Sequence, residues 1–177
     1  MTSPIEIRHE RSRVGKGRSA LNTFTAHILE HCLQQTGQAG AHLSIMYCGD
    51  EAIRRLNHRF RGIDKATDVL SFPSYEPDES QGGSHSYDFG EDETPHFGDL
   101  AISLPTVFRE AAEQGKDPVD HIALMLIHGY LHLLGYDHDT PDREARMWAE
   151  TDRLLTVLDS IDKPLVLLDD WEGAAAS

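Results

Sequence analysis

The chain has 177 residues, 39% of them hydrophobic and 26% charged, with a formal net charge of −14, which is typical of one soluble domain with its own core. No stretch approaches the roughly 18 uninterrupted apolar residues of a membrane span, and the charged N-terminal sequence MTSPIEIRHE lacks the apolar centre of a signal peptide. Cys32 and Cys48 have no CxxC spacing and are most simply reduced core residues, so we expect a cytoplasmic protein with no membrane partner.

The first third of the chain predicts two strands and two helices. Apolar residues alternate with polar ones at 5–7, which indicates a short strand. Apolar residues then recur every three or four positions from a cap candidate at Ser19 to a stop near Gly37, as in an amphipathic helix. A second strand is expected at 43–47 and a second helix at 50–57. The loop after the first strand is basic and contains Arg8, Arg11, Arg13, Lys16 and Arg18.

The middle of the chain predicts two more strands, separated by an acidic segment. A strand at 69–72 is expected to end at Pro73, which cannot donate a ladder hydrogen bond. Residues 74–98 are rich in Ser, Gly, Pro, Asp and Glu, and we expect them to form a mobile loop. The next strand is predicted at 99–103, and a helix capped near Ser103 follows it.

Two further helices are predicted near the end of the chain. Asp117 and Pro118 open the longest apolar helix, HIALMLIHGYLHLL, which is hydrophobic on most faces and should be the buried centre of the domain. Thr140 and Pro141 open the final helix, and the tail 164–177 is expected to be poorly ordered except for its apolar run LVLL, which could dock locally. The apolar stripe of the final helix is predicted to contain Met147, Trp148, Thr151, Leu154, Leu155 and Leu158.

These elements predict a single α/β (α+β) domain over residues 1–163. We expect a small mixed sheet of about four strands with helices flanking it, because each strand and helix is amphipathic and must bury one face against another layer.

The stretch HGYLHLLGYDH at 128–138 carries the strongest chemical signal. His128 and His132 lie four apart, so on a helix their rings stack on one face and their nitrogens can converge. Gly135 can end that helix in the left-handed conformation and let the chain bring His138 to the same point. A single histidine among the eleven in the chain is more simply a core residue. Three in one apolar run, with a fourth position left for water, favour a catalytic zinc site at the end of the buried helix.

An HxxxH pair invites comparison with zinc peptidases, whose sequence is HExxH and whose glutamate is the general base. The second position here is Gly129, so the residue on which peptide hydrolysis depends is absent. Glycine costs about 1 kcal/mol relative to alanine in a helix interior, which suggests a close neighbour at this position. A metal-dependent hydrolase that acts on another kind of bond is therefore favoured.

The charge is distributed unevenly along the sequence. Residues 1–65 hold ten Lys and Arg against six Asp and Glu, whereas residues 66–177 hold six against twenty-four. The segment 74–98 alone carries seven acidic residues and no Lys or Arg, so the rest of the chain carries only −7. Phosphate binding depends on a local basic patch rather than on the total, so RNA is not excluded, although a solvated surface explains the same pattern.

The stretch 128–138 resembles the HGxLHLxGYDH sequence of the YbeY family of endoribonucleases. A second stretch, LNHRFRGIDKATDVLSF at 56–72, resembles the other characteristic block of that family, and FGDLAIS at 97–103 lies in the expected place between them. The resemblance therefore covers nearly the whole chain. One departure is Ala66, where the family usually has proline, which loosens the entry to the third strand without removing a functional group.

The resemblance implies a single-strand-specific, metal-dependent endoribonuclease. Its implied role is maturation of the 3′ end of small-subunit ribosomal RNA and ribosome quality control. It implies one Zn²⁺ per chain, bound by His128, His132 and His138, and it places the arginine of the family at Arg61. A guanidinium can bind two phosphate oxygens and stabilise the charge that develops on them, so Arg61 and His128 are the predicted catalytic residues.

Other residues near these have weaker signals. Asp137 could orient a ligand imidazole or simply be an exposed aspartate, and His121 is interpreted as structural. Arg61 could instead be a surface arginine or form an ion pair with Asp64 or Asp68. The basic candidates for substrate binding are Arg55, Arg59 and Lys65.

The expected partners are single-stranded RNA, in particular ribosomal RNA, and the small ribosomal subunit or its proteins, but not DNA. Two other classes stay open. One is a non-catalytic ribosome-assembly factor in which the metal only stabilises the fold, and the less favoured one is a metal-dependent peptidase.

Overall fold

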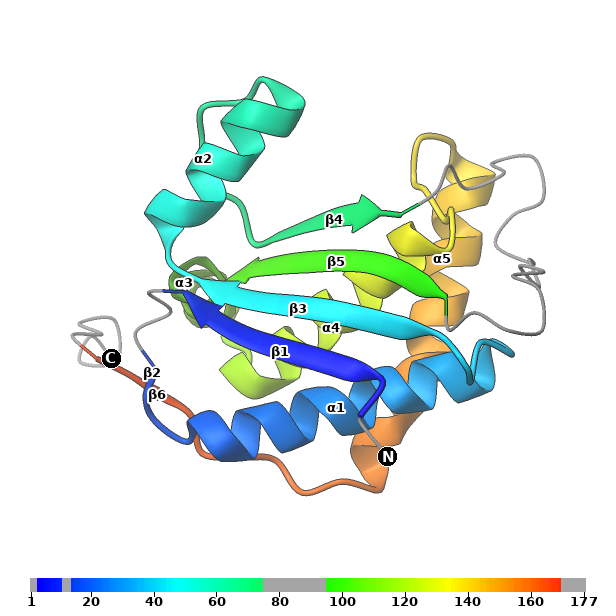
Figure 1. Ribbon diagram of the computed structural model, residues 1–177, viewed down its shortest axis with the longest axis horizontal. Helices are drawn as coiled ribbons and strands as arrows, with labels where there is room; N and C mark the ends of the chain where they lie inside the picture. The colour runs from blue at the N-terminus through cyan, green and yellow to red at the C-terminus, as the bar shows by residue number, and fades with distance from the viewer. Residues whose placement is uncertain (1–2, 11–13, 75–94, 170–177) are drawn as a thin grey trace.

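A mixed four-stranded sheet forms the frame of the molecule (Figure 1). The computed structural model describes residues 3–10, 14–74 and 95–169. The strand order is β1-β3-β5-β4, with three parallel strands and β4 antiparallel at one edge. The prediction of a single small α/β domain with a mixed four-stranded sheet is confirmed. The strands are β1 (Ile5–Glu10), β3 (His42–Cys48), β5 (His96–Ser103) and β4 (Val69–Pro73).

Five α-helices and one short 3-10 helix complete the described part of the chain. None of these helices is long and apolar enough to cross a membrane. A small antiparallel sheet pairs β2 (Val14–Lys16) with β6 (Leu167–Leu168). The helices are α1 (Arg18–Gln35), α2 (Asp50–Arg61), α3 (Leu104–Glu113), α4 (Pro118–Leu133) and α5 (Pro141–Leu155), and the 3-10 helix is Thr156–Asp159.

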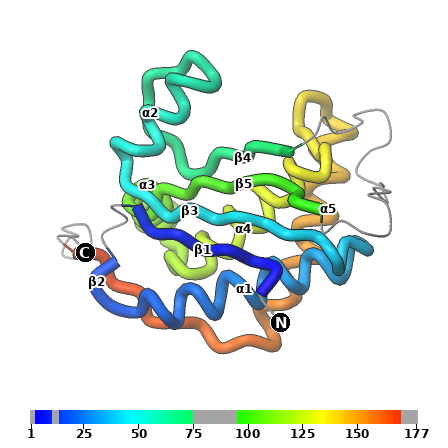
Figure 2. Tube along the Cα trace, viewed as in Figure 1, coloured from blue at the N-terminus to red at the C-terminus, as the bar shows by residue number. Residues whose placement is uncertain are grey.

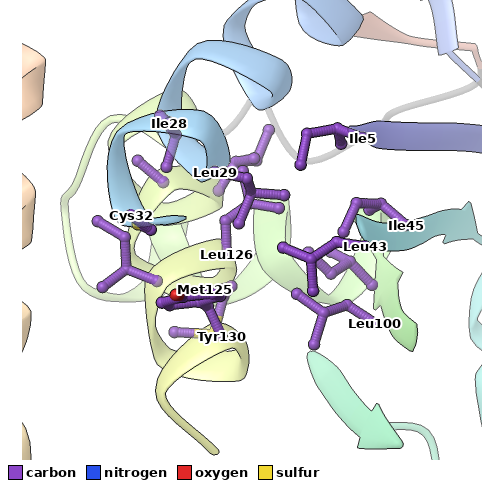
Figure 3. Close-up of a cluster of buried hydrophobic side chains, with 14 of the residues drawn as sticks. Ile5, Ile28, Leu29, Cys32, Leu43, Ile45, Leu100, Met125, Leu126 and Tyr130 are labelled. Atoms are coloured by element: carbon purple, nitrogen blue, oxygen red, sulfur yellow. The ribbon is translucent and has the colours of Figure 1, made fainter. Parts of the chain in front are cut away.

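Helix α4 is the buried centre of the domain, as its sequence predicts. It contacts α1, α3, α5, β4 and β5, and its trace passes behind the strands in Figure 2. Alternate residues of the strands, such as Leu43 and Leu100, point toward α1 and α4 and form one apolar cluster with Ile28, Leu126 and Tyr130 (Figure 3). Because this core surrounds α4, the position of its last turn is fixed from several sides.

The opposite face of the sheet is covered only in part. Helix α2 rises from the end of the sheet where β3 finishes (Figure 1). A second, smaller apolar cluster lies beneath it and contains Cys48, Ala52, Ile53, Leu70 and Ala101. The two cysteines are free and buried, in agreement with their interpretation as core residues.

Two predicted helix boundaries are wrong. Helix α1 begins at Arg18 after Gly17, which has a φ of 85°, so Ser19 is inside the helix and does not cap it. A side chain at position 17 would clash with the carbonyl of Leu165, so contact with the C-terminal segment sets this boundary. Helix α2 does not stop at Asn57 but continues to Arg61, where Gly62 ends it.

The sheet and the tail also differ from the prediction. Pro73 is the last residue of β4 and pairs with Gly98, and β5 begins at His96, so 96–98 belong to a strand and not to the predicted loop 74–98. Residues 75–94 of that loop lie outside the described residues. The LVLL run does dock, since Val166 is only 4% exposed and the next two residues form β6.

The predicted apolar stripe of the last helix is wrong at Trp148, and Leu158 lies in the 3-10 helix that follows α5. Met147 and Leu154 are buried, but Trp148 is 48% exposed. Its indole lies outside the core because that face of α5 borders a pocket rather than another element.

Candidate functional site

The three predicted metal ligands lie together at the end of α4. His128 and His132 occupy its last two turns and are half-buried, whereas His138 follows the helix and is exposed. The Nε2 atoms of His128 and His132 are 3.1 Å apart. One ring nitrogen from each of the three histidines lies within 4.8 Å of the other two.

Gly135 makes the turn that brings His138 back to the helix. Its φ is 88°, a conformation that costs glycine little. The N–H of Gly135 donates to the His132 carbonyl, and the N–H of Tyr136 donates to the Leu131 carbonyl, both at 3.0 Å. This hydrogen-bond pair is the Schellman motif of helix ends, and it fixes the direction in which the chain leaves α4.

The ring of His132 is oriented by the same turn. Its Nδ1 lies 2.9 Å from the carbonyl oxygen of Tyr136, and because a carbonyl only accepts, Nδ1 carries the proton. Nε2 is left with a lone pair that faces His128 Nε2. Two imidazole nitrogens this close share either a proton or a metal ion, and the third histidine beside them makes the set suitable for a metal.

The pKa values of the buried histidines support this assignment. Burial, together with the neighbouring rings of His132 and His138, lowers the pKa of His128 to about 4. Burial and His138 also lower the pKa of His132, although its hydrogen bond to the Tyr136 carbonyl acts in the opposite direction. Both rings are therefore neutral at pH 7, which is the form that binds metal ions.

The histidines open into a pocket of about 560 Å³, which we call the histidine pocket. Arg61, at the C-terminal end of α2, also lines this pocket. Within the described residues Arg61 forms no ion pair. Asp64, one predicted partner, instead accepts hydrogen bonds from Nε and Nη2 of Arg54 at 2.7 and 2.9 Å. The pocket is lined by Arg61, Thr67, Asp68, Val69, Ser71, Leu124, Met125, His128, His132, Asp137, His138 and Trp148.

The other predicted site residues are more widely spread. Arg55 lies on α2 and pairs with Glu51 at 2.9 Å, and the guanidinium of Arg59 lies 5.3 Å from the centre of the Phe60 ring. Neither of them, nor Lys65, lines the histidine pocket.

Asp137 does line the histidine pocket, and its carboxylate accepts the backbone N–H of His138 at 2.7 Å. The acceptor that faces a ligand ring is the Tyr136 carbonyl instead. His121 is 4% exposed and lies 3.3 Å from the Glu110 carboxylate.

Gly129 lets α4 pack closely against strands β4 and β5, because glycine has no side chain. An added Cβ would lie 3.0 Å from Leu100 Cδ2 and 3.1 Å from Val69 Cγ2, and the hydroxyl of Ser71 donates to the Gly129 carbonyl at 3.0 Å. The close neighbour that the sequence suggested is therefore present. The Cβ of a glutamate, as in HExxH, would press against the side chains of Leu100 and Val69.

Several residues of the pocket were missed from the sequence. Asp68 was considered only as a partner for Arg61, yet it lines the pocket and accepts hydrogen bonds from Thr67 and from the Val69 N–H. Ser71 lies in the same block, 56–72, and alternation along the strand could have placed it with Val69. Trp148 gave no such signal, because an aromatic residue at helical spacing predicts a core position.

The comparisons with known proteins identify the family of this chain. The family model described as Endoribonuclease YbeY matches residues 5–159. Proteins named Endoribonuclease YbeY from Halorhodospira halophila and Geobacillus thermodenitrificans are 42% and 35% identical over 130 and 156 residues, which is 73% and 88% of this chain and 78% and 96% of the relatives.

A solved structure shares the fold. The solution structure of TM1509 from Thermotoga maritima matches with a TM-score of 0.55 and 25% identity, over 88% of this chain and 92% of that one. The sequence matches cover most of the same domain. The chain belongs to the YbeY endoribonuclease family.

Proposed function

We propose that this protein is a metal-dependent endoribonuclease that cleaves single-stranded RNA in the cytoplasm. Its proposed role is maturation of the 3′ end of small-subunit ribosomal RNA and ribosome quality control, with the small ribosomal subunit or its proteins as partners. The observation that carries the proposal is that Arg61, which has no ion-pair partner among the described residues, and three convergent imidazoles line one pocket. This combination suits a phosphodiester substrate.

We infer that His128, His132 and His138 hold one zinc ion per chain. A zinc ion there would supply a Lewis acid for a phosphate oxygen and lower the pKa of water. The lowered pKa values of His128 and His132 favour their neutral rings, which is the form that binds a metal ion. The Tyr136 carbonyl holds the His132 ring so that Nε2 faces the pocket.

Arg61 has the substrate role in this proposal. Its planar guanidinium can donate two parallel hydrogen bonds to the scissile phosphate, which holds that group beside the histidines and stabilises the charge that develops during cleavage. The carboxylates of Asp68 and Asp137 also line the pocket and can accept a proton there.

The aromatic wall of the pocket supports a single-stranded substrate. Trp148 is half exposed beside the histidines, and an exposed indole can stack on a base that is free of its partner strand. A base that is paired in a duplex is stacked between its neighbours and cannot use this surface.

Two other functions fit the molecule less well. A peptidase of the HExxH type needs a glutamate at position 129, but the residue there is glycine, and a Cβ at this position would lie only 3.0 Å from Leu100 and 3.1 Å from Val69. A non-catalytic assembly factor would explain the metal ligands but gives no reason for an unpaired arginine in the same pocket.

The test is cleavage of a labelled single-stranded RNA and of the same sequence as a duplex by the zinc-loaded protein. We expect cleavage of the single strand, its loss with a chelator, and its return when zinc is added. A precursor with the 3′ end of small-subunit RNA should be cut near the mature end.

The control is His132→Ala at matched purity and folding, which must be inactive if the protein is the nuclease. Activity that persists in this variant would come from a contaminant, and the assembly-factor interpretation would then be preferred. Degradation of casein that a chelator stops would instead support the peptidase.

A further inference from the structure

The face of the sheet opposite α4 carries a second hollow, which we call the α2 groove. It has a volume of about 500 Å³ and lies between α2 and the open part of the sheet. Leu56 and Phe60 of α2 form one wall, Met46 and Phe72 contribute apolar surface from the strands, and Asp99 adds a carboxylate. The groove exists because the apolar cluster under α2 covers only one end of this face.

We propose that the α2 groove binds a nucleobase of the same RNA strand whose phosphate occupies the histidine pocket. This inference rests on the proposed function and deepens it, because it assigns a second contact to the single-stranded substrate. A base that enters the groove must leave its duplex, so the groove selects unpaired RNA.

The aromatic side chains of the groove fit a base. Phe60 is 57% exposed, and its ring meets Phe72 edge-on with 5.2 Å between the ring centres. The guanidinium of Arg59 lies over the same Phe60 ring. Phe60 thus presents an aromatic surface that is oriented by one neighbour and flanked by a cation, an arrangement that binds the π-face of a base and its phosphate together.

The two hollows lie on opposite sides of one strand. In β4, Val69 and Ser71 line the histidine pocket, whereas Phe72 lines the α2 groove. Two adjacent residues at the end of α2 also face different hollows: Arg61 lines the histidine pocket and Phe60 lines the α2 groove. A strand of RNA that leaves the histidines therefore reaches the groove by crossing the edge of β4.

The charges along this path suit a phosphate backbone. Arg54 and Arg55 are held by Asp64 and Glu51. Three other cations of the same segment, Arg59, Arg61 and Lys65, form no ion pair with a described residue, and they flank Phe60 in the sequence. Such unpaired cations supply the salt-dependent part of RNA binding.

The interior of the groove suits a base better than a phosphate. The Asp99 carboxylate lies there with the Ser44 side chain, and a carboxylate repels a phosphate but accepts a hydrogen bond from the amino group of cytosine. Arg8, the cation of the groove, is already paired with Glu6 at 2.6 Å. We therefore expect the backbone to follow the free cations outside the groove and one base to enter it.

The experiment compares Phe60→Ala and Phe60→Tyr with the wild type by fluorescence anisotropy of a labelled single-stranded 2′-O-methyl RNA. Loss of base stacking should weaken binding by roughly 5- to 100-fold in Phe60→Ala, and Phe60→Tyr should restore it. Ile63→Ala is the matched control, because Ile63 is 52% exposed close by and does not line the groove. An abasic oligonucleotide, which loses every base contact, should bind the wild type at least as weakly as the intact one binds Phe60→Ala.

A second readout separates the groove from the histidine pocket. Cleavage of bis(p-nitrophenyl) phosphate, which is too small to reach both hollows, should be equal in Phe60→Ala and wild type. Equal RNA affinity of Phe60→Ala and wild type would overturn the proposal. If Phe60→Ala keeps its RNA affinity but no longer binds a small-subunit ribosomal protein, the proposal is also overturned, because the groove then binds a protein partner. If the wild type binds RNA in the groove but never cleaves it, the proposed function fails and the groove assignment stands.

Discussion

The two parts of the site are held in different ways. The histidines belong to α4, a helix with eleven buried residues that is surrounded by three other helices and two strands. Arg61 belongs to α2, in which only Ala52, Ile53 and Asn57 are buried. The three histidines are therefore fixed by the core of the domain, whereas Arg61, the proposed substrate contact, belongs to a helix with few buried residues.

Hydrogen bonds at both ends of α2, rather than many buried side chains, hold this helix in place. At its start the Asp50 carboxylate accepts hydrogen bonds from Ser103, Thr106 and Arg109 at 2.7 to 2.9 Å. Although burial raises the pKa of Asp50, these hydrogen bonds hold it below its usual value. At the other end the Asn57 side chain donates to the Lys65 carbonyl at 2.8 Å. We therefore expect that mutations can alter metal binding and substrate binding separately.

The largest effect is expected from His132→Ala. The change removes one of three ligands, and we expect the affinity for zinc to fall by more than about 100-fold, which is the upper range for losing a group that merely supports a ligand. RNA cleavage should be lost with the metal. Elemental analysis after dialysis measures the metal content, and His27→Ala, on the exposed face of α1, should keep one ion per chain.

Arg61→Ala should reduce cleavage without affecting the metal. The loss of one charged donor from a phosphate that gains negative charge is expected to lower kcat by about 100- to 1000-fold. Arg61 is exposed and unpaired within the described residues, so Tm and zinc content should stay as in the wild type. Arg54→Ala is the matched control on the same helix and should keep nearly full activity, although it breaks the ion pair with Asp64. Equal losses in both variants would show that α2 acts through its general charge rather than through Arg61.

Gly129→Val tests whether close packing fixes the histidine side of the site. Its branched side chain must enter a space where even a Cβ is 3.0 Å from Leu100 and 3.1 Å from Val69. Overpacking of this kind should lower the free energy of unfolding by about 1–3 kcal/mol and weaken zinc binding, because the change lies next to His128. Thermal unfolding followed by circular dichroism measures the stability. Gly40→Val is the control, since no heavy atom lies within 4 Å of its Cβ position, and a similar loss there would contradict the packing argument.

Local chemistry explains which parts of the fold could be predicted from the sequence. Asp117 and Thr140 cap α4 and α5 as expected, with side chains that accept backbone N–H groups two or three residues on. The start of α1 could not be predicted, because it depends on contact between Gly17 and Leu165. The strand order likewise depends on pairing between distant segments, which no local pattern contains.

Part of the candidate site could likewise be predicted from local sequence, and part could not. The spacing of His128 and His132 and the turn at Gly135 are local features, and they were sufficient to predict the cluster. Only the family resemblance singled out Arg61, and the structure shows that it lines the same pocket. Trp148 was placed wrongly, because helical spacing does not show whether an apolar face meets a neighbouring element or a pocket.

The smallest effect is expected from Gly62→Ala, which tests whether the last turn of α2 holds Arg61 in position. Gly62 ends α2 with a φ of 71°, and a Cβ there would meet no atom within 4 Å, so the cost is that of the backbone conformation alone, about 1–2 kcal/mol. Gly115→Ala is the matched control, because Gly115 has a φ of 63° and an added Cβ would meet no atom within 4 Å. Gly115 lies between α3 and the start of α4, whereas the histidines lie at the other end of α4. Both variants should lose similar stability in urea unfolding, and both should keep their zinc. Only Gly62→Ala should also lower kcat/KM on RNA, by about 3- to 10-fold, a fraction of the effect of losing the guanidinium, because the last turn of α2 holds Arg61 over the pocket. If the two variants lose the same activity, the position of Arg61 does not depend on this turn, and α2 is held more firmly than its few buried residues suggest.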